Sequence, residues 1–284
     1  MLTQKLTPEI LAPGGSFEAV KAGIAAGASA VYVGLSRFSA RAFAKNFTVD
    51  SLPSVCSYCH ERGVKIYLAV NTLIHEADFV ELRGLVSLPV DAFILQDLGA
   101  IGIFSEKNIH ASTQMTIHNT DGLDFAKSVG FSRAVLSREL SREEIALLAS
   151  HALQIGIETE VFVYGALCMS VSGQCFMSAF FDKGKRSANA GSCAGACRLP
   201  FSQGRFNPSD RALSLKDQCL SEYVSELSAM GITSLKIEGR MKGSDYTSKA
   251  VKAIVSSAKK SHGMTDGYYT GKINDCFGKR DSQT

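Results

Sequence analysis

Short apolar runs alternate with helical patterns along most of this 284-residue chain. Each run has the length of a buried strand, and the segment after it repeats apolar residues every three or four positions, as an amphipathic helix does. The predicted strands lie at 9–13, 30–34, 65–71, 91–97, 108–113, 133–137, 160–165 and 234–239. The predicted helices lie at 16–27, 50–62, 76–87, 119–129, 141–153, 217–230 and 243–260, whereas the fourth connection, 99–106, is too short for a firm helix prediction.

Eight strand–helix units in succession favour a single α/β domain, a (β/α)8 barrel of the TIM-barrel type, over two separate domains. A doubly wound open sheet is the alternative. No Gly-x-Gly-x-x-Gly motif follows the first strand, which disfavours dinucleotide binding. We expect the barrel domain to span 1–265, with a cysteine-rich basic insertion at 166–212 after strand 7, and 266–284 to form a polar C-terminal tail.

Four of the eight cysteines fall in this insertion, spaced Cys168-x6-Cys175-x17-Cys193-x3-Cys197. Thiolates are soft ligands that suit zinc and iron–sulfur clusters. Structural zinc sites generally use two tight cysteine pairs, and only the second pair here is tight. The spacing therefore favours an iron–sulfur cluster, of the 4Fe-4S kind, over zinc. The four could instead be small buried apolar residues, and Cys219 could replace one of the ligands.

Two other cysteine patterns have simpler explanations. The segment 56–60, Cys-Ser-Tyr-Cys-His, matches a c-type haem attachment motif, but both cysteines fall on the apolar stripe of a predicted helix and should be buried. The segment 191–195, Gly-Ser-Cys-Ala-Gly, has the spacing of a nucleophile elbow, which requires a strand before it and a helix after it. A basic loop precedes it instead, so a cysteine nucleophile is the weaker interpretation.

The active site of such a barrel lies at the C-terminal ends of its strands. Polar residues at these ends would line a shared pocket: Asn71, Gln96, Asp97, Ser112, Gln114, Ser137, Arg138, Glu139, Tyr164, Glu238 and Arg240. We select His110, Glu160, Glu238 and Arg240 as candidate catalytic residues, although each taken singly is equally explained as a structural hydrogen bond or ion pair. The arginine could bind a carboxylate through two parallel hydrogen bonds.

The positive charge is concentrated beside the cysteines. The chain carries +3 overall, but residues 182–211 carry +4, so the remainder is close to neutral. We expect Lys183, Lys185 and Arg186 to contact RNA phosphates, and aromatic rings nearby would suit unpaired bases. A solvated loop explains the same charges equally well. The rings are Phe176, Phe180, Phe181, Phe201 and Phe206.

The composition is that of a globular protein, with 45% hydrophobic and 20% charged residues. The first residues lack the apolar core of a secretion signal, and no apolar run approaches the ~18 residues of a membrane span. We therefore expect a cytoplasmic protein that contacts neither membrane nor DNA. Thiols stay reduced in the cytoplasm, which favours a metal or redox site over disulfides.

The chain resembles a known family over most of its length. The segments that carry the resemblance are Leu11-Ala-Pro-Gly, Ala30-Val-Tyr-Val-Gly, His110-Ala-Ser-Thr-Gln, Glu160-x-Phe-x2-Gly-Ala-Leu-Cys-x4-Gly-x-Cys-x-Met-Ser, Gly184-Lys-Arg-Ser-Ala-Asn, Cys197-Arg-Leu-Pro, Leu215-Lys-Asp and Ser234-Leu-Lys-Ile-Glu-Gly-Arg-Met-Lys. They are similar to those of the collagenase-like peptidase family U32.

This resemblance implies several activities. Some members of the family are reported to degrade collagen. Others are RNA hydroxylation proteins that act on transfer RNA or 23S ribosomal RNA and require prephenate. A further pair takes part in ubiquinone hydroxylation and carries four-cysteine iron–sulfur clusters. The RNA-acting members continue into further domains, whereas this sequence ends soon after the last predicted barrel helix.

From the residues and the resemblance together, we expect an iron–sulfur protein that assists hydroxylation of an RNA base, with prephenate as the co-substrate that the family implies. The cluster ligands would be the four cysteines of the insertion. The alternative enzyme is a collagenase-like peptidase of undefined mechanism. The other alternative is an iron–sulfur subunit of a hydroxylation complex, which would add a protein partner.

Overall fold

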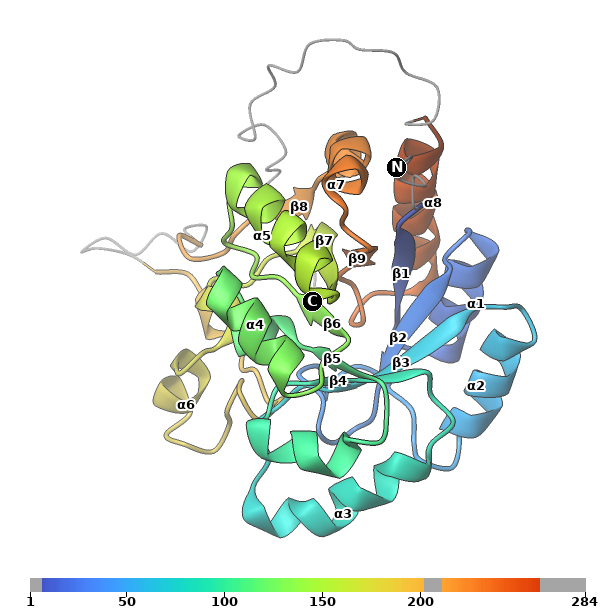
Figure 1. Cartoon of the computed structure of the whole chain (residues 1–284). Coiled ribbons are helices and arrows are strands. Elements are labelled where there is room, and N and C mark those ends of the chain that lie inside the picture. Colours follow the sequence, from blue (N-terminus) through green and yellow to red (C-terminus); the bar gives the residue numbers. More distant parts are fainter. Residues whose placement is uncertain (1–6, 202–210, 261–284) are drawn as a thin grey trace.

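Eight parallel strands form a closed barrel with helices around it (Figure 1). The computed structural model describes residues 7–201 and 211–260. The barrel strands are β1 (Glu9–Gly14), β2 (Ala30–Gly34), β3 (Lys65–Val70), β4 (Ala92–Leu95), β5 (Ile109–Ala111), β6 (Arg133–Val135), β7 (Glu158–Ala166) and β9 (Ser234–Ile237). The helices are α1 (Phe17–Ala25), α2 (Leu52–His60), α3 (Phe79–Gly84), α4 (Thr120–Ser128), α5 (Arg142–Ile155), α6 (Met177–Phe181), α7 (Val224–Met230) and α8 (Ser244–Lys260).

The strands follow one another around the barrel in chain order. The last strand, β9, pairs with β1 on one side and with β7 on the other, while β6 pairs with β7, so the ring has no open edge. The predicted (β/α)8 barrel is therefore confirmed and the open sheet is wrong. The predicted tail at 266–284 lies outside the described residues.

The connection after β4 forms a 3-10 helix, Leu98–Phe104, in place of an α-helix. Asp97 begins it by accepting a hydrogen bond from the backbone N–H of Gly99 at 2.8 Å. Two glycines in seven residues disfavour a regular helix there, since glycine is about 1 kcal/mol less favourable than alanine in a helix interior. The two glycines thus explain why the sequence of 99–106 gave no firm helix prediction.

One predicted element is partly wrong. We expected a helix over 217–230, but α7 begins only at Val224, and Asp217–Cys219 form a short strand, β8, antiparallel to β7. The physical reason is the length of β7. Its pairing with β9 ends at Tyr164, which would leave the backbone groups of its last residues without partners. β8 supplies those partners over Tyr164–Ala166.

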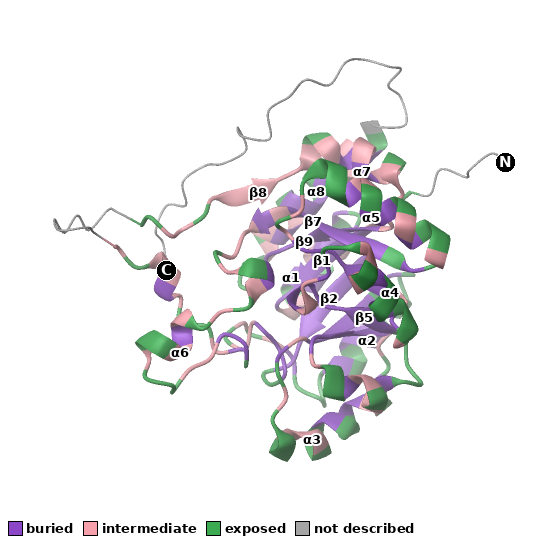
Figure 2. Ribbon diagram, turned by 60° about the vertical axis from the view of Figure 1, so that its left-hand side comes forward, coloured by how far each residue is buried: buried purple, intermediate pink, exposed green. Residues whose placement is uncertain are grey.

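The apolar core fills the space between the strands and the outer helices, and the strands are buried almost throughout (Figure 2). Cys56 and Cys59 belong to this core on the inner face of α2, as their helical spacing predicts. Burial raises the pKa of their thiols, to about 11 and about 12. Both therefore stay protonated at neutral pH, which suits structural residues. Among the described residues, no helix is long and apolar enough to cross a membrane.

The inside of the barrel holds a network of paired charges. Glu160 is fully buried and accepts hydrogen bonds from Lys236 Nζ at 2.7 Å and Arg133 Nη1 at 3.3 Å. Arg133 also pairs with Glu9 and Glu158, both at 2.6 Å. Burial alone would raise the pKa of Glu160, but the two cations outweigh burial and lower it. Each charge in this network has a partner, which is the arrangement that buried charges require.

Candidate functional site

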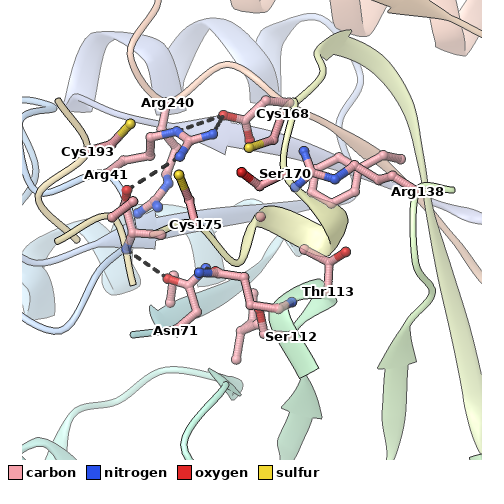
Figure 3. A pocket seen from close by; sticks show the side chains of 18 of the residues that line it. Arg41, Asn71, Ser112, Thr113, Arg138, Cys168, Ser170, Cys175, Cys193 and Arg240 are labelled. Carbon is pink, nitrogen blue, oxygen red and sulfur yellow. Dashed lines mark hydrogen bonds and ion pairs between the residues drawn. The ribbon is translucent and has the colours of Figure 1, made fainter. Parts of the chain in front are cut away.

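A pocket opens at the C-terminal ends of the strands, under the insertion that follows β7 (Figure 3). All four cysteines of the insertion line this mouth pocket, together with polar residues from the strand ends. The main polar and charged lining residues are Tyr32, Arg41, Asn71, Ser112, Thr113, Gln114, Arg138, Lys236, Glu238 and Arg240. The sequence placed the cysteines and most of these polar residues at one rim, and the structure brings them together there.

The insertion is anchored at its C-terminal half by Asn189. Its side-chain oxygen accepts a hydrogen bond from the Cys175 backbone N–H at 2.8 Å, and its carbonyl accepts one from the Leu73 N–H at 2.9 Å. Gly191 then passes very close to the loop after β2. It has a φ of 87°, and a Cβ there would lie 2.4 Å from the carbonyl oxygen of Ser39. Only glycine fits this approach, which brings Cys193 to the pocket.

The first turn of the insertion is anchored over β5 and β6. Ser172 is fully buried, and its hydroxyl donates to Glu139 Oε2 at 3.1 Å and is hydrogen-bonded to Ser137 Oγ at 3.0 Å. Gln174 donates from Nε2 to the Gln114 carbonyl at 2.8 Å. Cys168 and Cys175 flank this turn, so these contacts fix the segment between the first two thiols.

The four thiols surround the pocket without converging on one point. Cys193 is exposed, and the other three are half-buried. The Gly195 N–H donates to Cys193 Sγ at 3.4 Å. Burial raises the pKa of the Cys197 thiol, with smaller contributions from the nearby Cys168, Cys193 and Cys175.

Four thiol side chains line the pocket as possible ligands of a metal group. Among the described residues, no three His, Cys, Asp or Glu side chains meet closely enough to hold a single ion. Zinc needs four ligands at about 2.0–2.3 Å from one centre. A 4Fe-4S cluster is held by four thiolates, each on a different iron, so its ligands stand around a larger body. Four cysteines around one pocket are a donor set of the kind that holds such a cluster.

Arginines give the mouth pocket its electrostatic character. Arg41 binds Glu238 through Nε and Nη2, both at 3.1 Å, and the Tyr32 hydroxyl donates to the same carboxylate at 3.1 Å. Burial would raise the pKa of Glu238, but Arg41, Arg240 and Arg138 together lower it. One carboxylate thus faces three guanidinium groups, and the pocket has a surplus of positive charge.

Arg240 is held but incompletely paired. Its Nη1 donates to Ser39 Oγ at 2.5 Å, while its Nε has no hydrogen-bond partner among the described residues. Burial lowers the pKa of Arg240, since Tyr32 and Glu238 only partly offset the loss of solvent. A buried guanidinium with a free donor is suited to an anionic ligand.

The four candidate catalytic residues fall into two groups. Glu238 and Arg240 line the mouth pocket, as predicted. Glu160 and His110 lie deeper in the barrel and are absent from its lining. Burial and Arg133 lower the pKa of His110 to about 3, so its imidazole is neutral. Glu160 reaches the pocket only through Lys236, which lines the pocket while its ammonium binds Glu160.

The predicted RNA-contacting residues also differ from one another. Lys183 and Lys185 are exposed. Arg186 is half-buried and donates from Nη2 to the Cys193 carbonyl at 2.7 Å, with its guanidinium 4.7 Å from the Phe43 ring centre. It therefore supports the cysteine loop. The rings of Phe176, just before α6, and Phe180, within it, are each 80% exposed. Phe206 lies outside the described residues.

Sequence reasoning missed four of the polar lining residues, Tyr32, Arg41, Thr113 and Lys236, of which Arg41 and Lys236 carry charge. Arg41 comes from the irregular segment between β2 and α2, which carries no motif. Lys236 could have been found, because side chains two apart on a strand share a face. With Glu238 pointing into the barrel mouth, Lys236 and Ser234 had to face the same interior. Cys219, a possible substitute ligand, instead lines a separate cavity beside β8.

Comparison with known proteins identifies the family. The model of Peptidase family U32 matches residues 15–272. An uncharacterized protease of Methanocaldococcus jannaschii is 34% identical over 93% of this chain and 68% of its own. A 23S rRNA 5-hydroxycytidine synthase of Escherichia coli is 33% identical over 95% of this chain and 44% of its own. The tRNA hydroxylation protein P1 of Bacillus subtilis is 31% identical over 88% and 62%.

The fold comparison agrees. The solved structure of a U32 peptidase superposes with a TM-score of 0.56 and 13% identity, covering 84% of this chain and 96% of that one. The chain thus spans about half to two thirds of the length of the curated relatives it matches, and these relatives include both proteases and RNA-modifying proteins. With the barrel, the four-cysteine mouth pocket and a family match over nearly its whole length, this chain belongs to peptidase family U32.

Proposed function

We propose that this chain is an iron–sulfur protein that assists the hydroxylation of an RNA base. The observation that carries the proposal is the position of Cys168, Cys175, Cys193 and Cys197 around one arginine-rich pocket at the barrel mouth. These four side chains would hold a 4Fe-4S cluster. When bound, such a cluster supplies one-electron transfer.

The residues of the chain would bind and orient the reactants. Arg240 has a free Nε donor inside the pocket, so it is the best placed group for a carboxylate such as those of prephenate. Glu238 is held ionised by Arg41 and oriented by Tyr32, so it can accept a hydrogen bond from a substrate N–H or O–H.

The outer surface of the insertion supports RNA as the substrate. Lys183 and Lys185 offer charges for phosphates, and Phe176 and Phe180 offer exposed rings on which unpaired bases can stack. Two of the similar proteins act on ribosomal or transfer RNA according to their names. The substrate we propose is accordingly an unpaired base in structured RNA.

A peptidase is the second candidate, because one similar protein is named a protease. The pocket offers little for hydrolysis. Its described lining contains no histidine, and the hydrogen bonds of the described histidine side chains go to Asp91, Asp124 and a backbone carbonyl. A cysteine nucleophile therefore lacks a visible base.

Metal analysis tests the proposal directly. Protein purified without oxygen should be brown and contain about four iron and four sulfide per chain, as a 4Fe-4S cluster requires. Cys168→Ala should lose both, whereas Cys219→Ala should keep them, because Cys219 lies outside the pocket. One zinc per colourless chain would reject the cluster.

A second experiment separates the candidate functions. RNA from cells with and without the chain should differ in one hydroxylated base by mass spectrometry, and Arg240→Gln should abolish the difference. Gelatin cleavage that disappears in Cys193→Ala, with the fold and metal content intact, would instead establish a peptidase. If the modification is lost in cells without the chain and the purified chain carries a defined second protein with it, the chain is better described as a subunit of a hydroxylation complex.

A further inference from the structure

A second cavity lies beside the mouth pocket, on the outer side of the barrel wall. It encloses about 390 Å³, within the roughly 300–1,000 Å³ typical of small-molecule sites. It lies where β6 and β7 separate: their pairing ends at Val135 and Glu160, and β7 continues beyond β6, paired with β9 and then with β8. The start of α5, the strand β8 and the helix α7 close the other sides.

The walls of this lateral cavity are largely apolar. The main apolar lining residues are Leu140, Ile145, Val161, Leu220, Leu227 and Met230. A hydrocarbon or aromatic group that entered would be removed from water, at roughly 25 cal/mol per Å² of apolar surface buried. The cavity thus favours a ligand with an apolar body.

In the described ranges, two charged residues of the lateral cavity, Arg138 and Glu139, form no ion pair. Arg142 and Glu226 form an ion pair with each other, and Glu139 accepts hydrogen bonds from Ser172. Arg138 forms no hydrogen bond or ion pair with any other residue in the described ranges, and its guanidinium lies 5.2 Å from the Phe162 ring centre. The N-terminus of α5, a 14-residue helix, adds a partial positive charge at the same end.

Arg138 and Phe162 line both cavities and form the partition between them. In Figure 3, Arg138 reaches into the mouth pocket from the side opposite Cys193. A group bound to Arg138 from the lateral cavity would therefore lie next to the mouth pocket, while the rest of the ligand stayed outside the barrel.

We infer that the lateral cavity is a binding site for a small carboxylic acid with an apolar body. The carboxylate pairs with Arg138, and the apolar part packs against α7 and β8. This inference requires neither RNA nor a cluster, so it goes beyond the proposed function.

Titration calorimetry with two matched probes tests this site. The probes are 3-phenylpropionate and 3-phenylpropan-1-ol, which share an apolar body and differ in the charged end. The acid should bind saturably, one per chain, and about tenfold more tightly than the alcohol, because only the acid can form a charge-assisted hydrogen bond to arginine. Tenfold corresponds to about 1.4 kcal/mol.

Three variants locate the binding. Met230→Trp fills the lateral cavity alone and should abolish binding of the acid. Arg138→Gln should weaken binding of the acid about tenfold and remove its preference over the alcohol. Arg83→Gln, an exposed arginine on α3, is the control and should bind like the parent. Thermal unfolding confirms that each variant is folded.

The outcomes that overturn the inference are distinct. Absence of saturable acid binding to the folded parent rejects the site. If the acid binds to folded Met230→Trp as it does to the parent, the acid binds somewhere other than the lateral cavity. Equal affinity of the parent for acid and alcohol, or an unchanged preference for the acid in folded Arg138→Gln, removes the assignment of the carboxylate to Arg138. None of these results depends on whether the chain modifies RNA.

Discussion

The barrel interior and the mouth pocket use the same residue types in opposite ways. In the interior, Glu160, Arg133 and Lys236 are buried and paired within one network. At the mouth, Arg138 and Arg240 retain donors that no described residue accepts. Charges that satisfy one another stabilise a fold, and charges left unsatisfied mark where a ligand binds. Substitutions should separate the two regions, because interior changes affect stability and mouth changes affect binding.

The largest expected effect is that of Glu160→Gln. It removes the carboxylate that both Lys236 and Arg133 bind, and breaking a buried pair generally costs about 3–5 kcal/mol of unfolding free energy. Urea unfolding of the variant and of Glu81→Gln, an exposed control, measures the difference. A loss below about 1 kcal/mol, close to that of an exposed ion pair, would show that the interior network is not what holds the barrel.

His110 should make the interior sensitive to acid. Its pKa is about 3 in the fold and near its ordinary 6.5 when unfolded, so unfolding takes up a proton between these values. Stability is therefore fully present above about pH 6.5 and falls by up to about 1.4 kcal/mol per pH unit below it, about 2 kcal/mol by pH 5. His110→Phe should flatten this part of the stability–pH profile. An unchanged profile would mean that the pKa of the imidazole is the same in the folded and the unfolded chain.

Arg240→Met should have a small effect on stability despite the burial of the side chain. Burial lowers the pKa of Arg240, so the fold disfavours its charge, and a neutral side chain of similar length should change the unfolding free energy by no more than about 1 kcal/mol. Urea unfolding beside Glu160→Gln gives the direct contrast. A loss of unfolding free energy as large as that of Glu160→Gln would show that Arg240 holds the fold together.

Lys183→Gln with Lys185→Gln should leave stability within about 0.5 kcal/mol, because both side chains are exposed. If they contact phosphates of unpaired RNA, the log–log salt slope of binding should flatten by about 1.4 units. Lys252→Gln with Lys259→Gln removes equal charge from α8 and should leave the slope unchanged. Identical slopes in the two double variants would reject the phosphate contacts.

The contrast between the regions also limits what sequence could predict. A strand that is buried in the fold consists mostly of apolar residues, so it is visible as an apolar run in the sequence. For this reason the eight barrel strands were predicted. β8 was not, because Asp217-Gln-Cys219 is short and polar, and it forms only to satisfy the free end of β7. Its pairing is a tertiary effect without a local signal.

The mouth pocket was predicted in part for a similar reason. Cysteine spacing and polar strand ends are visible in the chain, so the four thiols, Glu238 and Arg240 were placed at one rim. The division of roles was not visible. Arg186 supports the Cys193 carbonyl and Glu160 binds Lys236, and nothing in the sequence states whether such a charge meets a ligand or a neighbour.

The place of β9 in the barrel has a consequence for biosynthesis. β9 joins β1 and β7, and its first residue pairs with Glu9 across 225 positions of the chain, so the ring cannot close until Ser234–Ile237 has been made. The four thiols are synthesised earlier, and at roughly 5–20 residues per second the interval between Cys197 and Ile237 is about 2–8 s. If the four thiols hold the proposed cluster, iron delivered within that interval would reach them before the ring closes. Iron delivered afterwards would have to pass the guanidinium groups of the mouth pocket.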